Sequence, residues 1–227
     1  ECFNRGRKCG ACGKVCAVSL TTCNGCGGSL AGVVESKTAN VFAGFCHGVA
    51  RGPFPFRVSA RLETERLFVF DGPLALTPCH VCAIPTDVHV PSACTLFLHP
   101  RRGARVLRSL EAGAWAAVEG AFLKDAAFVE AVYGKGAPPA AAALRSRAIA
   151  GMNVPPSQYQ LPLQYMIPPL LPSQYAMYRA GTHFTKGRFL PLAYLLDALD
   201  ALANAGKAVP DAEALDGAAL AARVADL

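Results

Sequence analysis

Residues 66–85 of the chain, RLFVFDGPLALTPCHVCAIP, indicate which fold to expect. Two apolar runs lie in this stretch, Arg66–Phe70 and Cys79–Ile84; the first ends in the turn sequence Asp-Gly-Pro and the second stops at a proline. Short apolar runs with such boundaries are typical of strands. Together with the run Arg57–Leu62 just before them, they predict three strands in the first half of the chain.

The rest of the chain mixes helical and strand patterns without a regular β-α-β alternation. Such a mixture points to an α+β protein with an antiparallel sheet. Two further strands are expected, Ala148–Val154 and Gln158–Ile167. Four helical segments are expected: Thr38–Ala50, Arg105–Tyr133 with a break near Lys124-Asp125, Pro191–Ala205 closed near Gly206, and Asp211–Leu227 as a helix or a partly ordered tail.

The composition is that of a globular chain with a mildly basic charge. Of the 227 residues, 52% are hydrophobic and 17% are charged, which excludes a chain that is disordered as a whole. No apolar run reaches the roughly 18 residues that a membrane span needs. The net charge of +6 suits an anionic ligand such as a nucleotide or RNA. The clearest basic cluster is either a solvated helix start or a contact for phosphates or RNA; it contains Arg101, Arg102 and Arg105, with Arg108 close behind.

Six of the ten cysteines lie within the first 26 residues, in a pattern typical of a metal site. Two C-x-x-C pairs, Cys9 with Cys12 and Cys23 with Cys26, are separated by ten residues. Each pair can form a tight turn, in which the glycine after the second cysteine adopts the positive φ that the turn requires. Four thiolates close a tetrahedral Zn²⁺ site with no open position, and such a site is structural rather than catalytic.

The exact set of four ligands is less certain than the metal. Cys16 and Cys2 are spare, and either can replace one ligand. A unit of about 25 residues cannot bury a useful core, so metal binding would supply much of its folding free energy. Cys79 and Cys82 form a third C-x-x-C, but a strand offers them no tight turn, and a second metal is not expected there. The clustering of six cysteines in the first 26 residues favours metal binding in a reducing compartment. We therefore expect an intracellular, cytoplasmic protein, with the mitochondrion as the alternative.

Two stretches of the chain resemble the histidine-triad (HIT) superfamily of nucleotide-binding proteins. The first runs from Phe45 to His89; it contains Gly52-Pro53-Phe54-Pro55, Leu67–Pro73 and the sequence PCHVCAIP, which is similar to the family pattern GHxLVIPKxH. The second, Asn153–Pro168, is similar to the family's catalytic strand. It looks most like the H-x-H-x-Q branches, the dinucleoside-polyphosphate phosphorylases and the hexose-1-phosphate nucleotidyltransferases.

The resemblance covers roughly residues 40–200 and implies the domain organisation. A zinc-ribbon module over residues 1–32 would precede a HIT-like domain over residues 33–227, with an antiparallel sheet, flanking helices and a C-terminal helical extension. HIT domains commonly pair through their sheets, so the resemblance also makes a homodimer a reasonable expectation.

In this family the middle histidine of the catalytic strand attacks the α-phosphate of a nucleotide. The corresponding positions here are Gln160, Pro162 and Gln164, and proline has no side-chain nucleophile. Proline inside a strand also removes one ladder hydrogen bond, so we expect an edge strand or a bulge at Pro162. Four residues are candidates for a replacement nucleophile: His80, His89, His183 and Cys82.

The resemblance also implies a set of nucleotide-binding residues, each of which has an ordinary structural alternative. The set is Asp71, His80, His89, Asn153, Ser157 and Gln164. His80 in an apolar strand can be a satisfied core histidine, and Asp71 before Gly-Pro can be a turn residue. Asn153 and Ser157 can cap a strand or a turn.

We therefore expect a zinc-containing, HIT-like nucleotide-binding protein that is catalytically impaired and acts as a binding or structural subunit. Two alternatives stay open. One is an active nucleotide hydrolase or nucleotidyltransferase that acts on a dinucleoside polyphosphate or a nucleotide sugar. The other is a zinc-ribbon component of an RNA-binding assembly. Whether the chain is an enzyme, and whether its partner is a nucleotide, RNA or another protein, stays open at this point.

Overall fold

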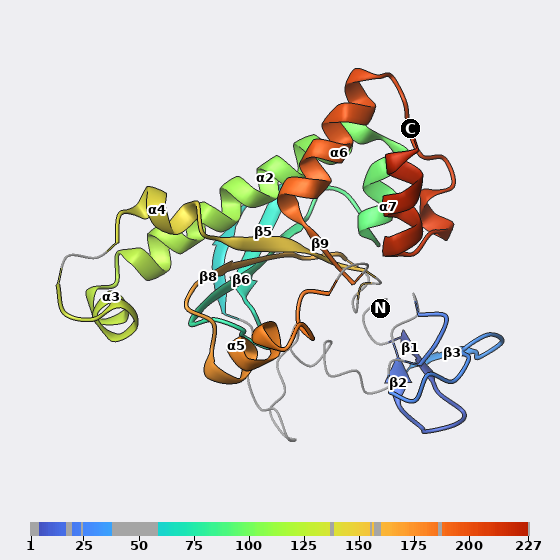
Figure 1. Cartoon of the computed structure of the whole chain (residues 1–227), viewed down its shortest axis with the longest axis horizontal. Coiled ribbons are helices and arrows are strands. Elements are labelled where there is room, and N and C mark those ends of the chain that lie inside the picture. Colours follow the sequence, from blue (N-terminus) through green and yellow to red (C-terminus); the bar gives the residue numbers. More distant parts are fainter. Residues whose placement is uncertain are drawn as a thin grey trace.

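The computed structural model describes residues 5–16, 20–23, 25–37, 59–136, 139–154, 156, 160–185 and 188–226, which contain two sheets (Figure 1). The smaller sheet is antiparallel and has the order β2-β1-β3: β1 (Arg5–Lys8), β2 (Val15–Cys16) and β3 (Glu35–Lys37). β3 lies beyond the predicted module end at residue 32, so this sheet extends to Lys37. We call the described residues between 5 and 37 the cysteine module. The helix predicted for Thr38–Ala50 lies outside the described residues.

The larger sheet has six strands in the order β4-β5-β6-β8-β7-β9, and every neighbouring pair is antiparallel. The prediction of an α+β fold with an antiparallel sheet is confirmed. The strands are β4 (Ala60–Glu63), β5 (Leu67–Asp71), β6 (Cys79–Pro85), β7 (Ile149–Asn153), β8 (Leu163–Ile167) and β9 (Phe189–Pro191).

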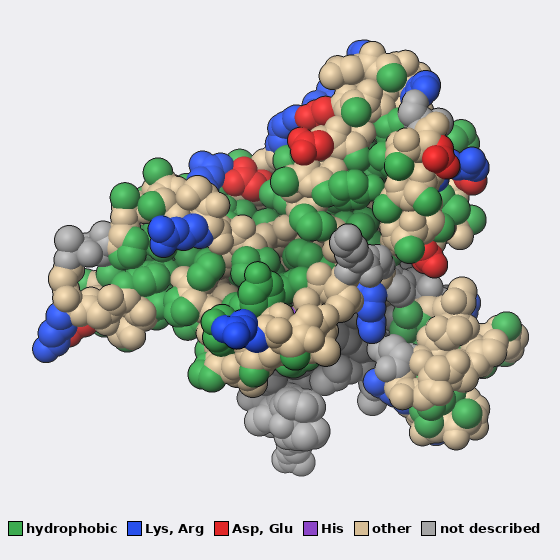
Figure 2. All heavy atoms as spheres, in the orientation of Figure 1, with side chains coloured by type: hydrophobic (Ala, Val, Ile, Leu, Met, Phe, Trp, Pro, Cys, Tyr) green, Lys and Arg blue, Asp and Glu red, His purple; other side chains and the backbone are tan. Residues whose placement is uncertain are grey.

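Two long helices, α2 (Pro100–Val118) and α6 (Leu192–Asn204), pack against each other and against this sheet (Figure 1). Figure 2 shows basic and acidic side chains lying next to one another along the edge that the two helices form. The other helical segments are η2 (Ala93–Leu98), η3 (Glu119–Leu123), α3 (Ala126–Tyr133), α4 (Ala141–Arg145), α5 (Pro172–Arg179), η4 (Ala212–Ala214) and α7 (Gly217–Ala225).

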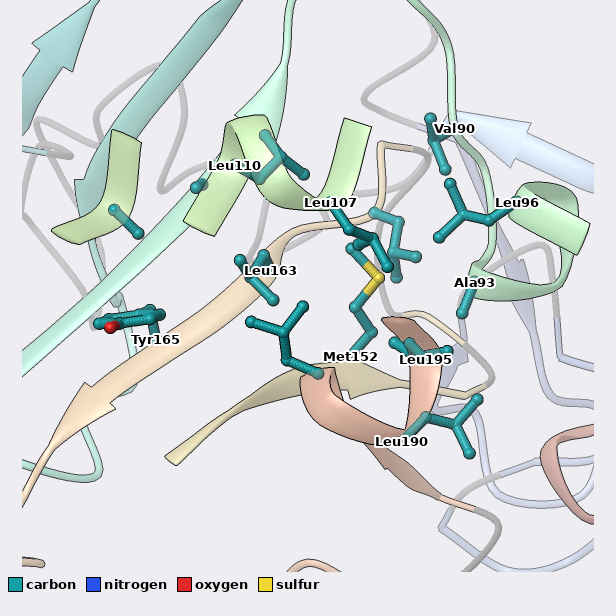
Figure 3. Close-up of a cluster of buried hydrophobic side chains, with 14 of the residues drawn as sticks. Val90, Ala93, Leu96, Leu107, Leu110, Met152, Leu163, Tyr165, Leu190 and Leu195 are labelled. Carbon is teal, nitrogen blue, oxygen red and sulfur yellow. The ribbon is translucent and has the colours of Figure 1, made fainter. Parts of the chain in front are cut away.

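The main core lies between the sheet and the two long helices (Figure 3). Along β6 the side chains alternate: Cys79, Val81 and Ala83 belong to this core, whereas His80 and Cys82 point to the opposite face. Fully burying a leucine contributes roughly 1.5–3 kcal/mol, so the buried leucines of α2 and α6 contribute strongly to holding the two helices on the sheet. Side chains from both helices and from β7 and β8 converge in Figure 3: Leu107, Leu110, Met152, Leu163, Tyr165 and Leu195.

The helical region that follows residue 100 breaks where the sequence predicts. Asp125 caps α3, because its carboxylate accepts hydrogen bonds from the N–H groups of Ala127 and Phe128. The start of the region differs from the prediction, since α2 begins at Pro100 rather than at Arg105. Proline is well suited to the first helical position, where its missing N–H has no partner to lose.

The prediction for the strand Gln158–Ile167 is wrong at its start. β8 begins at Leu163, so Pro162 precedes the first paired residue and Gln160 lies in the loop before the strand. The expectation of an edge strand or a bulge at Pro162 is wrong as well, because β8 is a central strand between β6 and β7. A proline just outside the ladder removes no ladder hydrogen bond, so a central strand can follow it directly.

Several elements were not predicted, among them α5 and β9. α5 starts with a proline, buries none of its residues, and exposes three large hydrophobic side chains, Tyr175, Met177 and Tyr178. β9 is an edge strand of only three residues, too short for its pattern to stand out in the sequence. Within the described residues no helix is both long and apolar enough to span a bilayer.

Candidate metal centre and polar cluster of the sheet

The two C-x-x-C pairs form two turns of the same geometry. In the first, the Cys9 N–H donates to the Lys14 carbonyl oxygen at 2.8 Å and the Gly13 N–H donates to the Cys9 carbonyl oxygen at 2.9 Å. In the second, the N–H groups of Cys23 and Gly27 make the equivalent bonds at 2.7 and 2.9 Å. Gly13 and Gly27 have φ values of +72° and +73°, which confirms the prediction that glycine is needed after each pair.

These turns bring the four predicted ligand sulfurs together. The Sγ atoms of Cys9, Cys12, Cys23 and Cys26 all lie within 4.8 Å of one another. The Cys9–Cys26 and Cys12–Cys23 sulfur pairs are 3.7 and 3.6 Å apart. A tetrahedron with metal–sulfur bonds of about 2.3 Å has edges of about 3.8 Å. The donor set therefore fits one tetrahedral metal ion, with Cys9 and Cys23 buried and the other two ligands exposed.

Backbone hydrogen bonds prepare the Cys23 sulfur for negative charge. The N–H groups of Cys26 and Gly25 lower the pKa of the Cys23 thiol to about 6, and the Gly25 nitrogen lies 3.3 Å from the sulfur. A lowered pKa favours the thiolate, which is the form that binds a metal. The turn thus supplies both the position of the ligand and part of the stabilisation of its charge.

A second group of functional side chains lies on the sheet face that points away from the main core. The thiol of Cys82 donates to Gln164 Oε1 at 3.3 Å, and His80 Nε2 lies 2.7 Å from the same oxygen. The Leu76 N–H donates to His80 Nδ1 at 3.1 Å. Because Nδ1 accepts this bond, Nε2 carries the proton and donates to Gln164. We call His80, Cys82 and Gln164 the polar cluster.

Burial keeps the polar cluster uncharged. His80 is 5% exposed, and burial lowers the pKa of its imidazole. Cys82 is 3% exposed, and burial raises the pKa of its thiol to about 12. A neutral imidazole with both nitrogens in hydrogen bonds has no lone pair to offer to phosphorus, and a protonated thiol is a poor nucleophile. Neither residue is prepared to act as the replacement nucleophile that the sequence analysis considered.

Gly72 closes the polar cluster on the side of β5. Its N–H donates to the His80 carbonyl oxygen at 2.8 Å, and a Cβ atom at this position would lie 2.7 Å from His80 Nδ1. The turn after β5 can approach the imidazole this closely only because residue 72 has no side chain. The sequence indicates a turn here, but it does not indicate this packing contact.

Gln160 holds a loop and does not belong to the polar cluster. Its Oε1 accepts a hydrogen bond from the Val90 N–H at 2.9 Å, and its Nε2 donates to the carbonyl oxygens of Pro85 and Val88 at 2.5 and 2.8 Å. Pro162 is buried between this loop contact and β8. Of Gln160, Pro162 and Gln164, the three positions that the resemblance compares with catalytic histidines, only Gln164 lies in the polar cluster.

Asp71 lies on the opposite face of the sheet from the polar cluster. It pairs across the ladder with Val81, which belongs to the main core, so the neighbouring His80 points the other way. Arg61 donates to both carboxylate oxygens of Asp71 at 2.7 Å, and its guanidinium lies 4.8 Å from the centre of the Phe122 ring. Asp71, one of the predicted nucleotide-binding residues, is therefore engaged by an arginine that the sequence analysis did not single out.

The other predicted binding residues are spread over the fold. Asn153 is exposed at the end of β7, and it shares the face of the polar cluster because Gly151, two residues before it, pairs with Gln164. His89 is exposed in the loop after β6. Ser157 lies outside the described residues.

His183 is the last predicted replacement nucleophile, and it lies before β9. It is half-buried, its ring is 4.1 Å from the ring of Phe184, and burial lowers the pKa of its imidazole. Its Nε2 has no hydrogen-bond partner in the part of the chain that the structure describes. Nothing there orients the ring as a catalytic base or nucleophile requires.

Comparisons with known proteins return a distant structural neighbour. No family model matches the chain, and no curated protein matches it. The solved structure "Hnt3 in complex with DNA and guanosine" is similar with a TM-score of 0.38 and 18% sequence identity, over 62% of this chain and 69% of that chain. A likeness at this level does not assign the chain to a family.

Proposed function

We propose that this chain is a HIT-like protein with a structural zinc site, in which nucleotidyl transfer has been lost and the larger domain serves as a binding or structural subunit. The observation that carries the proposal is the state of His80, whose two ring nitrogens are both engaged in hydrogen bonds. With Pro162 two positions before Gln164, no residue of the described polar cluster offers an attacking lone pair.

The contact between His80 and Gln164 supports the HIT-like reading. The two residues come from the two stretches that resemble the family, and they are 84 positions apart in the chain. A motif match by chance gives no reason for the matched residues to meet. Here their side chains share a hydrogen bond of 2.7 Å, as two parts of one former site would.

The zinc assignment rests on the chemistry of the donor set. Four cysteine sulfurs at tetrahedral spacing are the ligands that structural zinc sites use, and a closed set of four leaves no position for substrate. Elemental analysis of the purified full chain is expected to find about one zinc per molecule. A folded cysteine module in metal-free protein would refute the assignment.

Loss of catalysis is tested by incubating the full chain with dinucleoside polyphosphates and nucleotide sugars. Neither nucleotide release nor a phosphoramidate adduct is expected, because losing a nucleophile costs on the order of 10⁴–10⁶ in rate. The variant Pro162→His is expected to gain measurable hydrolysis, and Pro162→Ala serves as the matched control that should not. Robust turnover by the wild-type chain would overturn the proposal.

RNA binding is a second candidate function, favoured by the arginines of α2. Arg101 donates to the Ala203 carbonyl oxygen and Arg108 pairs with Asp200, but no ion pair engages Arg102 or Arg105 among the described residues. All four arginines lie in the first half of the helix, where the positive end of its dipole opposes them. Figure 2 also shows acidic side chains along this edge, which weaken the local positive potential.

Salt-dependent binding of a short RNA tests this second candidate. The double variant R102A/R105A is expected to weaken binding and to reduce the slope of log K against log salt by about 2, since each phosphate contact contributes roughly 0.9. The charge-matched control R66A/R147A removes two exposed arginines from elsewhere on the fold. Equal effects of the two double variants would exclude a specific contact at α2.

A further inference from the structure

Cys16 stands beside the metal centre without being one of its four clustered ligands. Its Sγ lies 3.6 Å from the Cys23 Sγ, the same separation as between Cys12 and Cys23. Cys16 and Cys23 are each 3% exposed, whereas Cys12 is exposed. One ligand is thus flanked by two thiols at equal distance, one open to solvent and one protected from it.

We propose that Cys16 is a reserve ligand of the metal centre, which takes the place of Cys12 when that sulfur leaves the metal. The inference rests on the proposed metal site. A separation of 3.6 Å is close to the edge of about 3.8 Å that a tetrahedral thiolate site requires. The sulfur of Cys16 therefore already stands from Cys23 at the distance that two ligands of one ion keep.

Cys16 and Cys12 lie in different backbone environments. Cys16 is the last residue of β2, and it pairs with Arg7 across the ladder of the small sheet. Cys12, by contrast, lies in the exposed turn between β1 and β2. When Cys16 replaces Cys12, the site retains its other three sulfurs and remains a site of four thiolates.

The exchange needs only one proton transfer. In the resting centre the Cys16 thiol donates to the Cys23 sulfur, so it carries a proton. When Cys12 dissociates it takes up a proton and becomes a thiol, while Cys16 gives up its own proton and forms the new metal–sulfur bond. The number of bound protons, the charge of the site and the number of metal–sulfur bonds are all unchanged.

A purely structural role for Cys16 makes a different prediction. As a hydrogen-bond donor and core residue of the cysteine module, it would support the site but never enter it. Removing Cys12 would then leave three thiolates on the metal, whatever residue stands at position 16. The number of bound thiolates in a Cys12 variant therefore distinguishes the two roles.

Cobalt(II) in place of zinc measures that number in the full chain, because the intensity of its sulfur-to-metal charge-transfer band rises with each thiolate. The wild type is expected to bind one cobalt ion with a four-thiolate spectrum. C12S is expected to keep that spectrum. Its affinity for cobalt should fall by about 10- to 100-fold, the range seen when residues that orient metal ligands are substituted. C12S/C16S is expected to fall to a three-thiolate spectrum, and C16S to keep four.

Cys26 provides the matched control, since it is the second cysteine of the other turn and is exposed like Cys12. C26S is expected to show three thiolates. A three-thiolate spectrum for C12S, a four-thiolate spectrum for C12S/C16S, or a four-thiolate spectrum for C26S would each overturn the inference while leaving the metal site intact. Failure of the wild type to bind cobalt would instead refute the metal site itself.

Discussion

At the scale of the residue, Gln164 decides the state of the polar cluster. One amide oxygen accepts hydrogen bonds from His80 and from Cys82, both of them buried. A buried donor that loses its acceptor costs much more than the hydrogen bond itself contributes, because the group has already given up water. Gln164 thus has two explanations: it lies in the stretch that resembles a catalytic strand, and it accepts the hydrogen bond that a buried histidine needs.

Gln164→Leu is expected to lower the free energy of unfolding by about 1–3 kcal/mol, because it leaves the His80 Nε2 proton without an acceptor. Denaturant unfolding monitored by fluorescence measures the loss. Gln174→Leu on the surface helix α5 is the matched control and should change the stability by no more than about 0.5 kcal/mol. Equal stabilities of the two variants would mean that Gln164 does not satisfy His80.

His80 also predicts how stability depends on pH. Burial lowers the pKa of the folded imidazole below its unfolded value, so the unfolded chain takes up the proton first. The stability is therefore complete above the ordinary imidazole pKa of about 6.5 and falls as the pH drops below it towards the folded value. Unfolding experiments between pH 8 and pH 5 measure this loss.

His183 shifts in the same direction and must be separated from His80. Because His183 is only half-buried, H183N is expected to retain most of the acid loss. The lowered pKa of Asp211, which arises from its hydrogen bond with Arg223, acts only at lower pH, near the ordinary range of carboxylates. If H183N removed the dependence between pH 8 and pH 5, His80 would not be its source.

At the scale of the element, the side chain of Gln160 holds the loop before β8 against the loop after β6. This one side chain makes three hydrogen bonds to main-chain groups at the end of β6 and in the loop after it. The Leu161 N–H also donates to the Val90 carbonyl oxygen at 2.8 Å. Pro162 follows, and the ladder starts at the next residue. The contacts of this segment hold the loop and lead directly into the central strand β8, and they present no nucleophile.

Gln160→Glu is expected to destabilise the protein by about 1–3 kcal/mol, because the carboxylate keeps the acceptor for Val90 but loses both donors to the carbonyl oxygens of Pro85 and Val88. Faster hydrogen exchange of the Val90 amide would localise the effect. The same change at Gln174, a half-buried position on α5, introduces the same charge away from this loop. A similar loss at both positions would point to the charge rather than to the loop.

At the scale of the whole molecule, the residues that the structure describes form two hydrophobic cores of very different size. The core of the cysteine module consists of three cysteines and Leu30, with Leu20 and Val33 packed against them. The main core gathers buried residues from the larger sheet and from helices α2, α6 and α7. So small a core cannot offset the entropy of ordering its chain. On the proposed metal site, we therefore expect the module to need a bound metal in order to fold, and the larger domain not to need one.

Removing the metal with a chelator is therefore expected to unfold the cysteine module alone. Trp115 is the single tryptophan and lies in the main core at 7% exposure, so the midpoint of its thermal transition should not move. Trypsin should then cleave after Lys8 or Lys14, and added zinc should restore protection. A chelator that lowered the Trp115 midpoint by several degrees would show that the two parts fold as one unit.

The sequence by itself determined the features that depend on residues close together in the chain. The clustering of four cysteines, the positive φ at Gly13 and Gly27, the cap at Asp125 and the antiparallel α+β class all follow from local patterns. The hydrogen bonds of a turn or a cap involve only a few neighbouring residues, so the local sequence is enough to predict them.

Only the tertiary structure decided which side chains meet. Asp71 and His80 look like parts of one site in the sequence, yet strand alternation and the ladder with β6 send them to opposite faces, where Arg61 engages one and Gln164 the other. The physical reason is that the face a side chain occupies depends on the register between distant strands, and a shift of one residue would reverse it.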